Sequence, residues 1–98
     1  MDLGNIRSEI DRIDSEMVRL FEERMKLACQ VAEYKKANQM PVYDSGRERQ
    51  VVNQLAEKID PEFERYMRML YTTMFAVSRS YQHQKIQSEG ELTKDLDK

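Results

Sequence analysis

The sequence predicts an all-α protein with three helices, the first of them very long. The 98 residues are 40% hydrophobic and 35% charged, with only three glycines and two prolines, a composition typical of helical domains. No alternating β-branched run argues for a strand. Apolar residues instead recur in steps of three and four from the first residues onward, which is the pattern of a helix packed against other helices. The length is enough for one small domain.

The first helix is expected from Leu3 to Asn38, a segment without proline. Its apolar seam consists of Leu3, Ile6, Ile10, Ile13, Met17, Leu20, Leu27, Val31 and Tyr34. Such a helix would be roughly 54 Å long, whereas a compact monomer of this size has a diameter of about 34 Å. A second chain must cover the part that overshoots, so we expect an intertwined helical homodimer.

Local signals place the two other helices. Pro41 lacks an amide hydrogen and ends the first helix. The second helix should begin at Asp44 or Ser45, either of which can act as the N-cap. Its apolar face is formed by Val51, Val52, Leu55 and Ile59.

The third helix should start with Asp60 as N-cap and Pro61 at the first helical position. Its apolar stripe comprises Phe63, Met67, Leu70, Met74, Val77 and Tyr81. The chain becomes polar beyond Ile86. We therefore expect residues 1–86 to form the domain and residues 87–98 to be a frayed polar tail or a linker.

The composition argues against several classes of partner. A net charge of −2 argues against a nucleic-acid partner, because phosphate binding normally shows an excess of basic residues. No apolar run approaches the ~20 residues of a membrane span, and the first residues contain no apolar signal core. The single cysteine, Cys29, cannot form an internal disulfide, and no Cys–His cluster suggests a metal. We expect a cytoplasmic protein that binds neither membrane, nucleic acid nor metal.

One position of the seam carries a charge. Arg24 stands between Leu20 and Leu27, where a buried apolar residue is expected. Burying a guanidinium is costly unless an anion meets it, and no other position of the seam is acidic. A ligand is one source of that anion. The alternative is an arginine that extends to solvent or pairs with a glutamate of another helix.

Besides Arg24, each of the three predicted helices carries further polar residues that could bind a ligand. Arg7 and Lys35 each follow a seam position and share one edge of the first helix. The start of the second helix offers free backbone amides, with Arg47 and Glu48 next to them; an exposed salt-bridged turn is the alternative. Ser78 and Gln82 lie four positions apart on one flank of the third helix, where they could also be ordinary polar positions.

Taken together, these groups suit a small dianion that bears a hydroxyl. The set holds cations, a neutral amide donor, a hydroxyl and one carboxylate. It does not suit hydrolysis, because neither a Ser–His nor a Cys–His pair is available and no carboxylate has an obvious nucleophilic role.

The sequence resembles the all-helical chorismate mutases, the small intertwined-dimer type found alone or fused to neighbouring shikimate-pathway enzymes. The resemblance covers about residues 3–85. It rests on three segments, IRSEIDRIDSEMVRLFEERMKLACQVAEYKK, PVYDSGRERQVVNQL and SRSYQ. It implies an all-α homodimer with shared active sites, chorismate as the substrate, and no cofactor.

The resemblance assigns roles to the cations and to the amide. Arg7 resembles the arginine that reaches into the partner subunit's site. Arg24 and Lys35 resemble the cations that hold the two carboxylates of the substrate. Lys35 and Gln82 resemble the two donors to the ether oxygen. Lys35, Gln82 and Arg24 would therefore be the catalytic residues.

The remaining matches concern the hydroxyl and the ring carboxylate. Asp44 resembles the residue whose backbone amide meets the substrate hydroxyl, and Glu48 resembles the carboxylate partner of that hydroxyl. Arg47 matches the family's arginine beside this glutamate. Ser78 matches the contact to the ring carboxylate.

The implied reaction is the pericyclic rearrangement of chorismate to prephenate, which needs no covalent intermediate. Two alternatives remain. One is an isochorismate pyruvate lyase, which uses the same fold and a similar set of cations. The other is a non-catalytic helical dimerisation or regulatory module of a fused shikimate-pathway enzyme.

Overall fold

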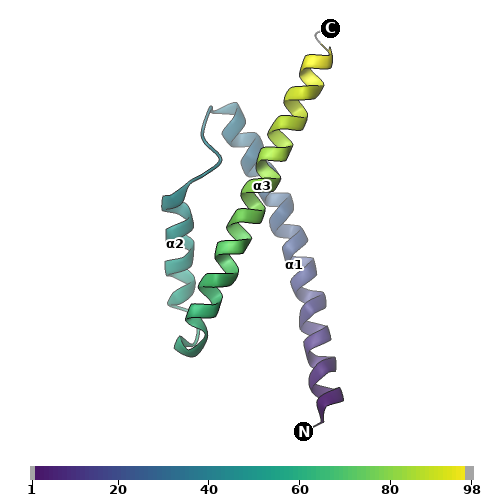
Figure 1. The fold of residues 1–98 in the computed structure, drawn as a ribbon, viewed down its shortest axis with the longest axis vertical. Coiled ribbons are helices and arrows are strands. Elements are labelled where there is room, and N and C mark those ends of the chain that lie inside the picture. The colour runs from purple at the N-terminus through teal and green to yellow at the C-terminus, as the bar shows by residue number, and fades with distance from the viewer. Residues whose placement is uncertain (1, 97–98) are drawn as a thin grey trace.

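The computed structural model describes residues 2–96, with side chains as far as residue 87. Its elements are α1 (Leu3–Ala37), α2 (Ser45–Ala56), the 3-10 turn η1 (Pro61–Phe63) and α3 (Glu64–Leu96). Figure 1 shows the two long helices crossing, with α2 beside the N-terminal half of α3. Within the described residues the protein is all helical, which confirms the predicted fold class.

Local capping sets the ends of α1. The Asp2 carboxylate accepts a hydrogen bond from the Gly4 amide at 3.1 Å, which satisfies one of the free N–H groups of the first turn. At the other end, Asn38 is the C-cap, and its side-chain amide donates to the Tyr34 carbonyl at 2.8 Å. Gln39 then adopts a positive φ of 55°, which turns the chain out of the helix before Pro41. The predicted helix is confirmed to within one residue.

Small residues on α1 form its contact with α3. Ala28 and Ala32 are 6% and 1% exposed, and both belong to the C-terminal half of α1. Helix α1 crosses α3 and packs against it (Figure 1). Phe75 of α3 is likewise buried, at 8% exposed. The apolar seam of α1 stays largely exposed within one chain, and its packing against other helices remains a prediction. The alanine face packs instead, because small side chains let two helix backbones approach closely.

The second helix begins as the local sequence predicts. Of the two candidate N-caps, Asp44 takes the role, because its carboxylate accepts from the Arg47 amide at 3.0 Å. All four residues of the predicted apolar face are half-buried; Val51, Val52 and Leu55 lie in α2, and Ile59 lies just after its end. The helix packs against α3. Asp60 caps the next element through the Glu62 amide at 3.0 Å. That first turn is a 3-10 turn, so α3 itself starts at Glu64.

The third helix continues further than expected. We expected residue 87 to begin a frayed tail or a linker, and the helix runs on to Leu96. The segment contains no proline, and Gly90 alone costs a helix only about 1 kcal/mol. A linker role for residues 87–98 remains a prediction, and residues 97 and 98 lie outside the described range.

The single chain is extended and leaves much of α1 uncovered. Its radius of gyration is 17.8 Å, against about 13 Å for a compact chain of this length. Ile10, Met17 and Leu20 of the apolar seam are 49%, 51% and 50% exposed. None of the helices described here is long and apolar enough to cross a membrane.

Candidate active site

A cavity of about 320 Å³ opens where α1, α2 and α3 meet. Ligand pockets in proteins typically occupy roughly 300–1,000 Å³, so this space suits a small molecule. Seven of the predicted site residues line it, and they come from all three helices and from the loop before α2. They are Arg24, Lys35, Asp44, Arg47, Glu48, Ser78 and Gln82.

Two cations of α1 face this cavity. Arg24 is half-buried, and its guanidinium carbon lies 5.9 Å from the centre of the Phe75 ring. Lys35 is also half-buried, and its Nζ donates to the Val42 carbonyl at 2.8 Å. No carboxylate forms an ion pair with either cation within residues 2–87. Their charges are therefore left for an anion from outside this part of the chain.

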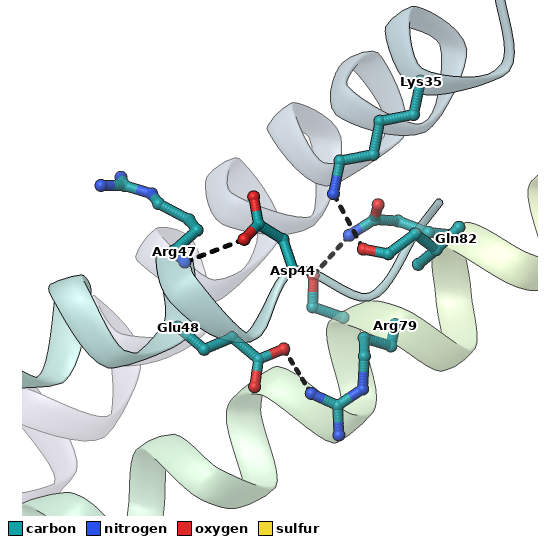
Figure 2. A network of polar contacts seen from close by, with 8 residues as sticks. Lys35, Asp44, Arg47, Glu48, Arg79 and Gln82 are labelled. Carbon is teal, nitrogen blue, oxygen red and sulfur yellow. Dashed lines mark hydrogen bonds and ion pairs between the residues drawn. The ribbon is translucent and has the colours of Figure 1, made fainter. Parts of the chain in front are cut away.

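The N-terminus of α2 supplies an acidic edge. Glu48 faces the cavity one turn into the helix, whereas the Asp44 carboxylate is engaged as the N-cap. Arg47 donates from its guanidinium to the Gln50 side chain at 2.9 Å. In Figure 2 this guanidinium points away from Lys35 and Gln82. Arg47 thus lines the cavity without directing its charge at the donors of α1 and α3.

On the α3 side, Ser78 and Gln82 form a buried polar pair. They are 8% and 7% exposed, and the Gln82 Nε2 donates to the Ser78 Oγ at 3.1 Å. The Gln82 Oε1 is buried without a hydrogen-bond partner among the described residues. A buried polar atom without a partner costs about 1–3 kcal/mol. The ends of the Lys35 and Gln82 side chains point toward each other (Figure 2), and both residues line the cavity.

Sequence reasoning missed Arg79. This residue lines the cavity, and its Nη1 forms an ion pair with the Glu48 Oε2 across 31 residues of sequence. The expected alternative of a salt-bridged turn between Arg47 and Glu48 is wrong, because Glu48 pairs with α3 instead. The signal was available in part, since Arg79 lies three residues before Gln82 and so shares a helix surface with it.

Arg7 is the predicted site residue that this chain does not bring to the cavity. It is exposed near the N-terminus of α1. At about 1.5 Å per residue, it lies roughly 26 Å from Arg24 and roughly 42 Å from Lys35 along the helix axis. No side chain spans such a distance, so Arg7 cannot act in the cavity of its own chain.

Comparison with known proteins gives a family match. Residues 6–83 match the family model described as chorismate mutase type II, which is most of the chain. The matched range includes every predicted site residue. No solved structure matches the chain.

Three curated relatives, each 41% identical, share part of the chain. The chain resembles the bifunctional chorismate mutase/prephenate dehydratase of Aquifex aeolicus over 54 residues, which are 55% of this chain and 15% of the relative. Over 46 residues, 47% of this chain and 12% of the relative, it resembles the T-protein of Haemophilus influenzae. Over 54 residues, 55% of this chain and 14% of the relative, it resembles the bifunctional chorismate mutase/prephenate dehydratase of Buchnera aphidicola. The chain thus matches only a small part of each relative's length.

Proposed function

The chain belongs to the chorismate mutase type II family, and we propose that it rearranges chorismate to prephenate. We propose that it acts without a cofactor, as a cytoplasmic homodimer with shared sites. The observation that carries the proposal is the cavity itself. Arg24 and Lys35 of α1, which have no ionic partner in residues 2–87, line a space of about 320 Å³ together with the buried donors of α3.

The proposed binding mode follows from the charges. Chorismate carries two carboxylates, and Arg24 and Lys35 are the cations without an ionic partner in residues 2–87. Ser78 accepts a hydrogen bond from Gln82, so its own O–H remains able to donate to the ring carboxylate. The Asp44 backbone amide and the Glu48 carboxylate, at the acidic edge, would bind the hydroxyl of the substrate.

Two groups are proposed to stabilise the transition state. One carbon–oxygen bond breaks as one carbon–carbon bond forms, and negative charge grows on the ether oxygen. Lys35 uses one of its three donors on the Val42 carbonyl, and Gln82 uses one of its two amide hydrogens on Ser78. Both therefore keep donors to spare, and they point toward each other (Figure 2). Preorganised donors of this kind are worth roughly 3–4 kcal/mol each.

This reaction requires positioning more than covalent chemistry. The enolpyruvyl arm must fold over the ring before the new bond can form. Cations that hold both carboxylates achieve this by fixing the conformer in which the reacting carbon atoms lie close together. The site contributes donors and charges, which is the chemistry that such a rearrangement uses.

The exposed seam of α1 and the position of Arg7 support the proposed homodimer. A continuous row of half-exposed apolar residues marks an interaction surface in a protein of this size. A second copy of α1 offers a matching apolar row, and a two-fold symmetric dimer would bury both. In the same arrangement Arg7 of the partner subunit would lie at the cavity of the first subunit, which the first subunit's own Arg7 cannot reach.

A chorismate assay tests the proposed function. Purified protein is mixed with chorismate and, in a separate reaction, with isochorismate. The loss of substrate absorbance is followed, and the products are identified by mass spectrometry. Prephenate, together with loss of turnover in Lys35→Ala, is the expected result. Salicylate and pyruvate from isochorismate, without prephenate from chorismate, would favour the lyase. No turnover of either substrate by a folded protein would favour the non-catalytic module.

A further inference from the structure

Arg79 connects two elements at the acidic edge of the cavity. Its guanidinium pairs with the carboxylate of Glu48 on α2, as Figure 2 shows. The same guanidinium lies over the Tyr43 ring, with 5.0 Å between its carbon and the ring centre. Arg79 on α3 therefore contacts both the loop that leads into α2 and the first turn of that helix.

This pair differs from the surface ion pairs of the chain. The side chains of Arg79 and Glu48 are 30% and 23% exposed, against 45% and 44% for Arg68 and Glu64 on α3. Exposed pairs contribute little because water screens them, whereas a partly buried, charge-assisted pair fixes geometry more strongly. The planar guanidinium can stack on the ring and donate to the carboxylate at the same time, which lysine cannot do equally well.

We propose that Arg79 is a positioning residue that aims the Glu48 carboxylate at the hydroxyl of the substrate. The inference rests on the proposed function, in which Glu48 accepts the hydrogen bond of that hydroxyl. Without Arg79 the carboxylate is free to rotate toward solvent. Stacking on Tyr43 holds the guanidinium in place and ties the loop before α2 to α3. Arg79 acts on the reaction through Glu48 and makes no contact of its own with the reacting atoms.

A double-mutant cycle tests this role. Arg79→Gln is prepared in the wild-type protein and in the Glu48→Gln variant, and kcat/KM for chorismate is measured for all four proteins. In the wild-type background we expect a loss of about tenfold, the value of one charge-assisted hydrogen bond. In the Glu48→Gln background the same change should have little effect, because the carboxylate that Arg79 positions is absent.

Two further variants separate positioning from general stability. Arg79→Lys keeps a cation near Glu48 and should retain more activity than Arg79→Gln, at similar thermal stability. Arg68→Gln removes the other arginine of α3 that pairs with a glutamate, away from the cavity, and should leave kcat/KM unchanged. If Arg79→Gln fails to fold, Arg79→Lys is measured in both backgrounds, and its smaller loss of kcat/KM should likewise disappear in the Glu48→Gln background.

Several results would overturn the inference. Unchanged activity of folded Arg79→Gln would exclude the role. Equal losses in both backgrounds would mean that Arg79 acts on the substrate directly. An equal loss in Arg68→Gln would reduce the effect to a general one. A wild-type protein that does not convert chorismate would instead refute the proposed function, and the inference would fall with it.

Discussion

Gln82→Glu should convert a pH-independent activity into one that depends steeply on pH. The Gln82 amide does not titrate in the usual range, and it is proposed to donate to the ether oxygen at every pH. A glutamic acid at this position donates only when it is protonated. Deprotonation would also place a carboxylate against the growing negative charge of the transition state. The sign is therefore fixed: activity of the variant rises as the pH falls.

The size of the effect follows from the fraction of protonated acid. With an unperturbed pKa of about 4.3, only about one molecule in 500 is protonated at neutral pH. Each unit of lower pH should then raise kcat/KM about tenfold until the pKa is approached. Two features of the site shift the pKa of the new glutamic acid in opposite directions. Burial at position 82, 7% exposed, raises the pKa of the new acid, and the facing ammonium of Lys35 lowers it.

The assay is chorismate loss between neutral and mildly acidic pH, with the wild-type profile measured in the same buffers. Gln82→Ala is the matched control, because it lacks a donor at every pH and should stay poorly active throughout. Circular dichroism at each pH verifies that the variant remains folded. A flat profile for folded Gln82→Glu would remove Gln82 from the ether-oxygen role.

Two other substitutions test the charge in the seam and the helix contact. Arg24→Leu should abolish catalysis but keep the dimer and raise its melting temperature. The stability gain should be on the order of 1 kcal/mol, because a costly buried cation is replaced by an apolar residue. Retained activity or strong destabilisation of this variant would mean that Arg24 has a structural role. Ala32→Leu should lower the free energy of unfolding by about 1–3 kcal/mol, because Ala32 is 1% exposed between α1 and α3 and leaves no room for a larger side chain; chemical denaturation checks this, and wild-type stability would argue against the described helix crossing.

Local chemistry made the element boundaries predictable. The start of α2 at Asp44 and the restart at Asp60 depend on side chains that bond to amides two or three residues away. Pro41 and Asn38 likewise act within one turn of the end of α1. The far end of α3 was less predictable, because a polar segment without proline can remain helical as well as fray.

Tertiary partners were harder to predict. Periodicity identified the apolar seam of α1, but it did not show that the alanine face with Ala28 and Ala32 contacts α3 of the same chain. The Glu48–Arg79 pair joins positions 31 residues apart, and no local pattern connects them. The family resemblance predicted which residues would surround one cavity, and seven of the eight lie there.

The proposed mutase has active sites that are shared between two chains, and subunit exchange tests this sharing most directly. Arg7 lies roughly 42 Å from Lys35 along α1, so each site should combine Lys35 of one chain with Arg7 of the other. Arg7→Ala and Lys35→Ala should each be nearly inactive alone. A mixed dimer of the two variants would have one site with both defects and one site with neither.

The measurement is chorismate turnover after the two variants are unfolded together and refolded. Random pairing should make about half of the dimers mixed and restore about a quarter of the wild-type activity. Native mass spectrometry verifies that mixed dimers are present, and each variant refolded alone is the control. Mixed dimers without any recovered activity would contradict the account, because Arg7 and Lys35 would then serve the same chain's site.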